Sequence, residues 1–189
     1  MIAMTDYREE LLRLLHLLSY EEREVTLTSG RKSNFYIDGK QTTCHARGAF
    51  LTGQLFYETI KTAGIPIRGV GGLTMGADPI VAAISVISAL RDDPLHAFLI
   101  RKEPKGHGKQ LWIEGDKNFK PGDPVAIVED VVTSGGSLLK AVERARAHDL
   151  KVEMALTLVD REEGGAELLA ENGLKLIALF TKTDIKNLR

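Results

Sequence analysis

The segment Pro124-Val125-Ala126-Ile127-Val128-Glu129-Asp130-Val131-Val132-Thr133-Ser134-Gly135-Gly136-Ser137 decides the fold of this 189-residue chain. Its apolar, β-branched first part, 124–128, is typical of a buried strand. Glu129 and Asp130 place two carboxylates at the carboxyl end of that strand, and a small hydroxyl- and glycine-rich turn precedes the helix-like segment 138–147. Loop amides and a helix N-terminus bind phosphate, while paired acids accept hydrogen bonds from sugar hydroxyls or hold a hydrated metal. The segment therefore predicts a site for a sugar phosphate, although such turns also serve packing alone.

This run resembles the phosphoribosyl-pyrophosphate (PRPP) signature of the type I phosphoribosyltransferases: hydrophobic residues, two acids, two hydrophobic residues, then Thr-x-Gly-x-[Ser/Thr/Ala]. The resemblance implies that 133–137 holds the 5′-phosphate and that the acids hold ribose hydroxyls, directly or through hydrated Mg²⁺. Neighbouring strand residues face opposite ways, so we favour Asp130 for the direct contact. The implied PRPP contacts in this segment are Glu129, Asp130, Val131, Val132, Thr133, Ser134, Gly135, Gly136 and Ser137. The chain has neither a P-loop nor a G-x-G-x-x-G motif, which argues against a P-loop nucleotidase and a dinucleotide-binding fold.

Composition points to one soluble domain, 1–189. Hydrophobic residues make up 43% and charged residues 27%, and the formal net charge of −1 argues against a nucleic-acid partner. The single cysteine, Cys44, excludes an internal disulfide and fits a reducing cytoplasm. The charged N-terminus lacks an apolar signal-type core, and the apolar run 80–90 is too short to span a bilayer. We therefore expect a cytoplasmic protein with no membrane partner.

Alternating strands and helices predict an α/β fold with a mostly parallel twisted sheet flanked by helices. We expect a small N-terminal hood, mainly 1–45, and a core from about 46 to 189. The predicted helices are 6–19, 46–63, 78–90, 138–147 and 166–171, and the predicted strands are 67–71, 96–101, 124–128, 152–159 and 174–180. Ligands of such sheets bind outside the carboxyl ends of the strands. The loops 72–76, 102–115, 129–137 and 160–165 all fall there, and 102–115 is expected to be long and mobile.

A second motif, Arg101-Lys102-Glu103-Pro104-Lys105-Gly106-His107-Gly108-Lys109, is rich in cations and glycines. A solvated charged loop is the plainer interpretation. The spacing, however, resembles the catalytic loop of the orotate phosphoribosyltransferase family, Arg-Lys-x-x-Lys-x-His-Gly. The resemblance implies that all four basic residues of that pattern contact PRPP, and that Lys105 and His107 act in catalysis together with Asp130. Cations near a leaving pyrophosphate stabilise charge that develops only in the transition state.

In the resembling family this loop serves the partner subunit's site, which implies a homodimer here. Its glycines would let the loop close and exclude water. Mg²⁺ bridging the pyrophosphate and the ribose hydroxyls is the implied cofactor.

We expect the segment from Thr26 to Asp38, together with Arg161, to form the end of the site that binds the pyrimidine base, which we call the base end. The first stretch resembles the family's Ser-Gly-x-x-Ser-x-x-Tyr hood over the pyrimidine, although aromatic pairs at strand ends are usually core. Arg161 would bind the orotate carboxylate through a bidentate bond, while a surface ion pair is the alternative. The residues expected near orotate are Thr28, Phe35, Tyr36, Ile37, Thr133 and Arg161. Many relatives carry Lys where this chain has Thr28, which cannot supply the charge.

The loop Gly72-Leu73-Thr74-Met75-Gly76 is a second departure. Many relatives place a lysine before the second glycine, where it touches pyrophosphate, and Met75 cannot do so. We keep Thr74 and Met75 as PRPP contacts through their main chain. The whole pattern predicts transfer of the phosphoribosyl group from PRPP to orotate. A purine phosphoribosyltransferase, or a PRPP- or nucleotide-sensing regulator on the same fold, is the alternative.

Overall fold

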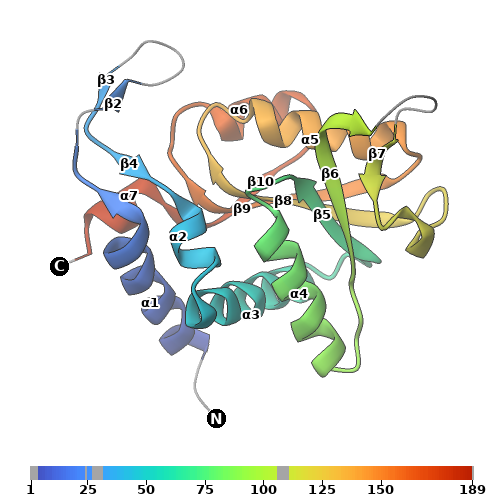
Figure 1. Cartoon of the computed structure of the whole chain (residues 1–189), viewed down its shortest axis with the longest axis horizontal. Helices are drawn as coiled ribbons and strands as arrows, with labels where there is room; N and C mark the ends of the chain where they lie inside the picture. The colour runs from blue at the N-terminus through green and yellow to red at the C-terminus, as the bar shows by residue number, and fades with distance from the viewer. Residues whose placement is uncertain (1–3, 24, 27–31, 106–110, 189) are drawn as a thin grey trace.

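The fold is built on a six-stranded sheet, seen edge-on in the computed structural model of Figure 1, which describes residues 4–23, 25–26, 32–105 and 111–188. In spatial order its strands are β10 (Leu176–Thr181), β9 (Lys151–Asp160), β8 (Pro124–Val132), β5 (Gly69–Leu73), β6 (His96–Lys105) and β7 (Leu111–Glu114). Every neighbouring pair is parallel except β6 and β7. The predicted mostly parallel sheet is confirmed.

Helices cover both faces of the sheet (Figure 1). One face carries α1 (Met4–Leu14), α3 (Ala46–Thr62) and α4 (Asp78–Leu90), and the other carries α5 (Gly136–Ala147) and α6 (Gly165–Glu171). Two separate apolar cores result. Leu51 and Ile80 belong to the first core, and Leu138 and Leu169 to the second, all fully buried. In the described residues, no helix is long and apolar enough to cross a membrane.

The side of the sheet on which the chain adds its next strand changes at β5. From β5 the chain adds β6 on one side, then returns to place β8 on the other. Open parallel sheets bind ligands at such a switch point, outside the carboxyl ends of the strands. The turn after β5, 74–76, and the end of β8 with its following turn therefore meet at the position where the sequence motif predicts its ligand.

Three predicted boundaries are wrong. The strand β8 runs through Glu129 and Asp130 to Val132, because parallel pairing with β9 continues to that point. Segment 102–115 is not a plain loop, since β6 extends to Lys105 and β7 pairs with it antiparallel. The first sheet strand begins at Gly69 rather than Ile67.

The N-terminal segment packs beside the sheet core. It continues from α1 through a π-helical turn, η1 (Leu15–Ser19), into β1 (Tyr20–Glu21), β2 (Val25–Thr26), β3 (Lys32–Ser33), β4 (Tyr36–Ile37) and α2 (Gly39–Thr43). The paired strands are β1 with β4 and β2 with β3, both antiparallel. The division into a hood and a core stays a prediction. A last helix, α7 (Lys182–Lys186), follows β10 and starts with a Thr181/Asp184 capping box.

Candidate active site

The two acids of β8 line a single cavity of about 170 Å³ at the carboxyl edge of the sheet. We call this the carboxyl-edge cavity; its lining residues are Lys40, Leu73, Thr74, Met75, Gly76, Lys102, Glu129, Asp130 and Ser137. Both acids line the same cavity at the end of β8, although they are neighbours in the strand, and the direct contact of Asp130 with the ribose stays a prediction.

The two acids differ in their surroundings. Burial raises the pKa of the Glu129 carboxyl to about 8; the negative charge of Asp130 adds to the rise, and Lys102 opposes it. Asp130 is 8% exposed. Its Oδ1 accepts a hydrogen bond from the Val131 N–H at 3.0 Å, and the Lys40 ammonium lies 3.6 Å from its Oδ2. Asp130 is thus held as an acceptor, while Glu129 retains a proton at neutral pH.

Two glycines allow the chain to close around Asp130. A Cβ on Gly76 would lie 2.4 Å from Asp130 Oδ1, and a Cβ on Gly39 would lie 3.0 Å from Asp130 Cβ. The first distance is too short for a side chain and the second is tight, so glycine at these positions lets the turn after β5 and the start of α2 approach the acid closely.

The turn after β8 presents a helix N-terminus to the same edge. Gly135 takes the left-handed conformation, φ 82°, and directly precedes α5, which has no side-chain cap. The first amides of α5 therefore remain available to an external acceptor. Ser134, Gly136 and Ser137 are exposed and Thr133 is half-buried, as a phosphate-binding turn requires.

The base of the β6–β7 hairpin is fixed by a residue that sequence reasoning missed. Arg144 on α5 donates to the carbonyls of Arg101 at 2.5 Å and Lys102 at 3.1 Å, and its guanidinium lies 4.0 Å over the Trp112 ring. The hairpin is therefore tied to the helix that follows the phosphate-binding turn. Nothing in the Arg144 sequence context signals this, because the contact spans 42 residues.

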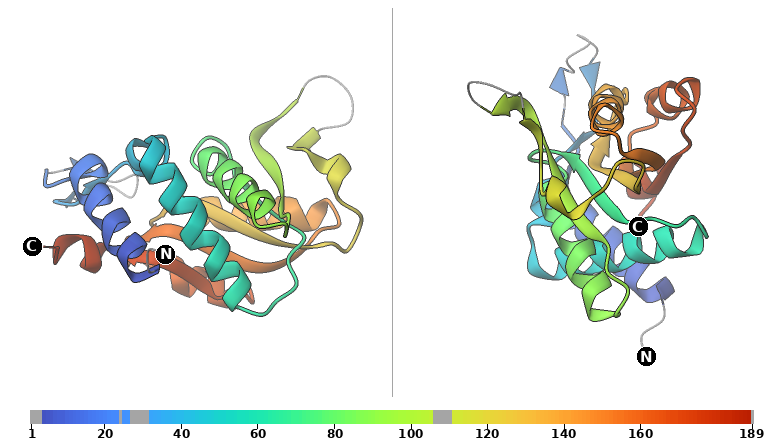
Figure 2. Two further views of the ribbon diagram at one scale, coloured as in Figure 1. Left: turned by 90° about the horizontal axis from the view of Figure 1, so that it is seen from below. Right: turned by 90° about the vertical axis from the view of Figure 1, so that its right-hand side faces the viewer.

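Beyond this anchor the hairpin extends away from the helical layers, as Figure 2 shows. Arg101 pairs with Glu114 of β7 at 3.1 Å, while Lys102 lines the carboxyl-edge cavity. The backbone of Lys105 ends β6. His107 lies outside the described residues, so its predicted role stays a prediction.

At the end of β9, Arg161 is 7% exposed and joins the N-terminal segment to the core. Its guanidinium donates to the Phe35 carbonyl at 3.3 Å and to Glu163 at 3.0 Å, and it lies 5.6 Å from the Phe35 ring. The structure thus brings Arg161 together with the predicted hood segment. Phe35 and Ile37 are buried, and Tyr36 is half-buried against Arg23. Thr28 lies outside the described residues.

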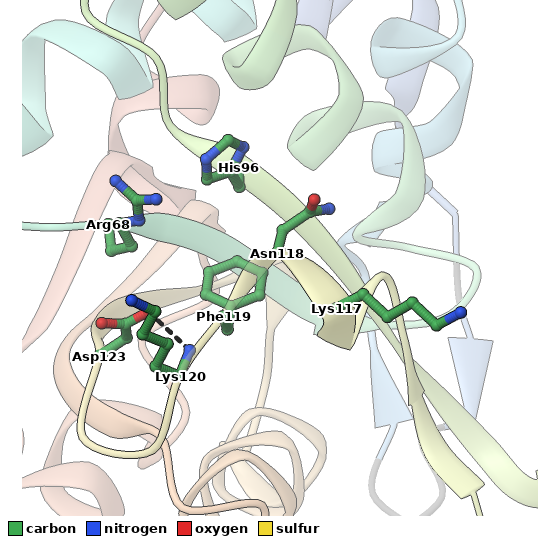
Figure 3. Close-up of a pocket in the computed structure, with 7 residues that line it drawn as sticks. All are labelled: Arg68, His96, Lys117, Asn118, Phe119, Lys120 and Asp123. Carbon is green, nitrogen blue, oxygen red and sulfur yellow. Dashed lines mark hydrogen bonds between the residues drawn. The ribbon is translucent and has the colours of Figure 1, made fainter.

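A larger hollow, about 530 Å³, lies at the opposite edge of the sheet (Figure 3). We call it the amino-edge groove; its lining residues are Arg68, His96, Lys117, Asn118, Phe119, Lys120 and Asp123. Figure 3 shows Lys117 directed away from Arg68 and His96. Its acid, Asp123, accepts a hydrogen bond from the Lys120 backbone at 2.8 Å. None of the motif residues that the structure describes lines this groove, so size alone does not identify the site.

The described fold has close counterparts among solved structures. A phosphoribosyltransferase from Corynebacterium diphtheriae superposes with a TM-score of 0.80 at 34% identity, covering 96% of this chain and 99% of that chain. The orotate phosphoribosyltransferase of Mycobacterium tuberculosis in complex with PRPP gives 0.77 at 35% identity, covering 95% and 99%. The fold is that of the type I phosphoribosyltransferases.

Comparison of sequences shows to which family of type I phosphoribosyltransferases the chain belongs. No family model matches the chain. The orotate phosphoribosyltransferase of a Nostoc species is 46% identical over 179 residues, which cover 95% of this chain and 85% of that protein. The chain therefore belongs to the orotate phosphoribosyltransferase family.

Proposed function

We propose that the carboxyl-edge cavity is the PRPP site and that Arg161 marks the base end. The chain transfers the 5-phosphoribosyl group of PRPP to orotate, giving orotidine 5′-monophosphate and pyrophosphate. The observation that carries the assignment is that both acids of the signature and the turn after β5 line one cavity beside the N-terminus of α5. The turn 133–137 holds the 5′-phosphate, and the acids hold the ribose hydroxyls.

Bond cleavage at the anomeric carbon leaves positive charge on the ribosyl group and negative charge on pyrophosphate. Lys102, which lines the cavity, and Lys105 and His107 further along the hairpin stabilise the leaving group. Such contacts accelerate the reaction because they strengthen as charge develops. Orotate is anionic and needs no strong base, so no residue is assigned as a general base.

The ring of orotate lies against the hood segment and its carboxylate meets the Arg161 guanidinium. Support comes from the position of Arg161, which is buried at the end of β9 and bonded to the Phe35 carbonyl. A buried guanidinium offers a carboxylate two parallel donors, which selects orotate over uncharged bases. Thr133, Tyr36, Ile37 and Thr28 remain proposed neighbours of the base.

Mg²⁺ fits this donor set as a cofactor carried mainly by PRPP. Glu129 and Asp130 would offer adjacent oxygen ligands at the cavity, and a magnesium ion would take further ligands from substrate phosphates and water. When bound, the ion neutralises the pyrophosphate and so assists its departure. The two acids would hold it directly or through its water.

The active form is a homodimer in which the catalytic loop is shared across subunits: Lys102 stays in its own cavity, and the hairpin beyond it serves the partner's cavity. The hairpin extends away from its own layers, which supports a role outside its own subunit (Figure 2). Large apolar side chains on α4 support a contact between copies, since Val86 and Leu90 are 60% and 77% exposed. We place the enzyme in the cytoplasm, where the single thiol of Cys44 stays reduced.

The assignment is tested with purified protein, PRPP and Mg²⁺ against orotate, uracil, adenine, hypoxanthine and xanthine. We expect loss of orotate absorbance and formation of pyrophosphate with orotate alone. Consumption of a purine instead would favour the purine branch of the fold. No consumption of any base would favour a ligand-sensing regulator.

A further inference from the structure

Lys40 lies in the carboxyl-edge cavity, although no sequence motif singled it out. It belongs to the short helix α2, and its ammonium lies 2.6 Å from Asp38 Oδ1 and 3.6 Å from Asp130 Oδ2. The bond to Asp38 raises the pKa of Lys40, with Asp130 adding to the rise, so the group is a permanent cation at physiological pH. Lys40 therefore joins the N-terminal segment to the acid that we assign to the ribose.

The cavity needs such a cation once an anionic ligand enters. Its described lining offers two ammonium groups, those of Lys40 and Lys102, while the carboxylates of Asp38 and Asp130 lie in or beside it and Glu129, with its raised pKa, is protonated at neutral pH. The pyrophosphate of PRPP brings further negative charge. Met75 lines the same cavity and is 71% exposed, yet its thioether offers no charge.

The geometry leaves Lys40 free to serve a ligand as well as the acids. An ammonium group has three donors. Asp38 engages one of them at 2.6 Å, Asp130 lies 3.6 Å away as an ion-pair partner, and the side chain remains 44% exposed at the cavity. Asp38 also caps α2 by accepting from the Lys40 backbone N–H at 3.2 Å, which fixes where the lysine stem begins.

We propose that the Lys40 ammonium binds the pyrophosphate group of PRPP while it remains paired with Asp38. The assignment rests on the proposed PRPP site and adds to it a cation from the N-terminal segment. Lys40 thereby supplies from α2 a charge that the turn after β5 lacks. It is a binding residue for the known reaction.

The test compares Lys40→Met with the wild-type protein in calorimetric titrations with two probes, Mg-pyrophosphate and ribose 5-phosphate. We expect pyrophosphate affinity to fall roughly 10- to 100-fold, the usual range for one charge-assisted hydrogen bond. Ribose 5-phosphate affinity should change less than threefold, and the KM for PRPP should rise while the KM for orotate holds. Equal weakening of both probes would overturn the proposal in favour of a purely structural role for Lys40, as would unchanged pyrophosphate affinity.

Two further variants separate charge from packing. Lys61→Met removes an ammonium that is likewise paired with a carboxylate, Asp93 at 2.7 Å, but outside the cavity, and should leave both affinities unchanged. In the Lys40→Met background, Met75→Lys returns a cation to the same cavity and should recover pyrophosphate affinity. A double variant that binds no better than Lys40→Met would contradict the proposal. Wild-type protein that fails to consume orotate would instead count against the proposed function.

Discussion

The two edges of the sheet both carry cations around a hollow, yet only one has the arrangement of a transferase site. The amino-edge groove is the larger, about 530 Å³ against 170 Å³. Its one acid, Asp123, is already engaged by a backbone amide in a tight turn. The carboxyl-edge cavity instead combines two acids, glycines that allow close approach, and a nearby uncapped helix N-terminus. Convergence of acceptors and donors, rather than volume, therefore distinguishes the site.

The largest difference between the edges should come from removing one acid at each. Asp130→Asn removes the charge that meets the reacting ribose, and we expect kcat/KM to fall about 10²- to 10³-fold, as for loss of one electrostatic contact to the transition state. Asp123→Asn is the matched change at the amino edge and should leave the rate unchanged. Steady-state kinetics with both substrates check this. Equal losses for the two variants would erase the distinction between the edges.

Lys105→Ala should lower kcat about 10²-fold while it weakens PRPP binding much less, because its charge is needed most as pyrophosphate leaves. Lys120→Ala, at the amino edge, is the control. Mixed dimers of Lys105→Ala with Asp130→Asn subunits should recover activity if the hairpin works on the partner. Verified mixed dimers that stay inactive would argue for hairpins that serve their own subunit.

Arg161→Met should raise the KM for orotate roughly 10- to 100-fold, with little change in the KM for PRPP. The variant removes the buried guanidinium that binds the carboxylate of orotate. The change also leaves Glu163 without its 3.0 Å partner. The double variant Arg161→Met/Glu163→Gln removes the charge of the Glu163 carboxylate as well. It should show the same KM for orotate as Arg161→Met alone. A rise in the KM for PRPP alone would move Arg161 to the other end of the site.

The smallest effect is a pH dependence of stability. The folded-state pKa of Glu129 is about 8, against an ordinary 4.5. The loss of folding stability caused by this carboxyl is therefore absent below pH 4.5 and grows as the pH rises to 8. The slope approaches at most ~1.4 kcal/mol per pH unit. Thermal melts from pH 5 to 8.5 should therefore fall more steeply for the wild type than for Glu129→Gln. Glu171→Gln, an exposed change on α6, should follow the wild type; parallel curves for all three would contradict the buried position of Glu129.

The carboxyl edge of the sheet was predictable where its functional residues follow one another along the chain. The run from Pro124 to Ser137 carries strand, acids and turn in order, so periodicity and residue type sufficed for the fold class and the phosphate turn. Arg161 was predictable as a charged residue at a strand end.

Other parts depend on contacts between distant segments and left no local signal. Lys40 reaches Asp130 across 90 positions, and Arg144 reaches the hairpin from another helix. The hairpin itself was missed because Gly- and Lys-rich sequence reads as a loop, while antiparallel pairing of β6 with β7 extends the strand to Lys105. Both Glu129 and Asp130 line the cavity at the end of β8, and which of them meets the ribose stays a prediction.

A crystal structure of the protein with Mg-PRPP tests the central claim most directly. We predict density for the 5′-phosphate at 133–137, ribose hydroxyls at Asp130, and pyrophosphate beside Lys40 and Lys102. PRPP bound at the amino-edge groove, with the carboxyl-edge cavity holding only water, would contradict the account.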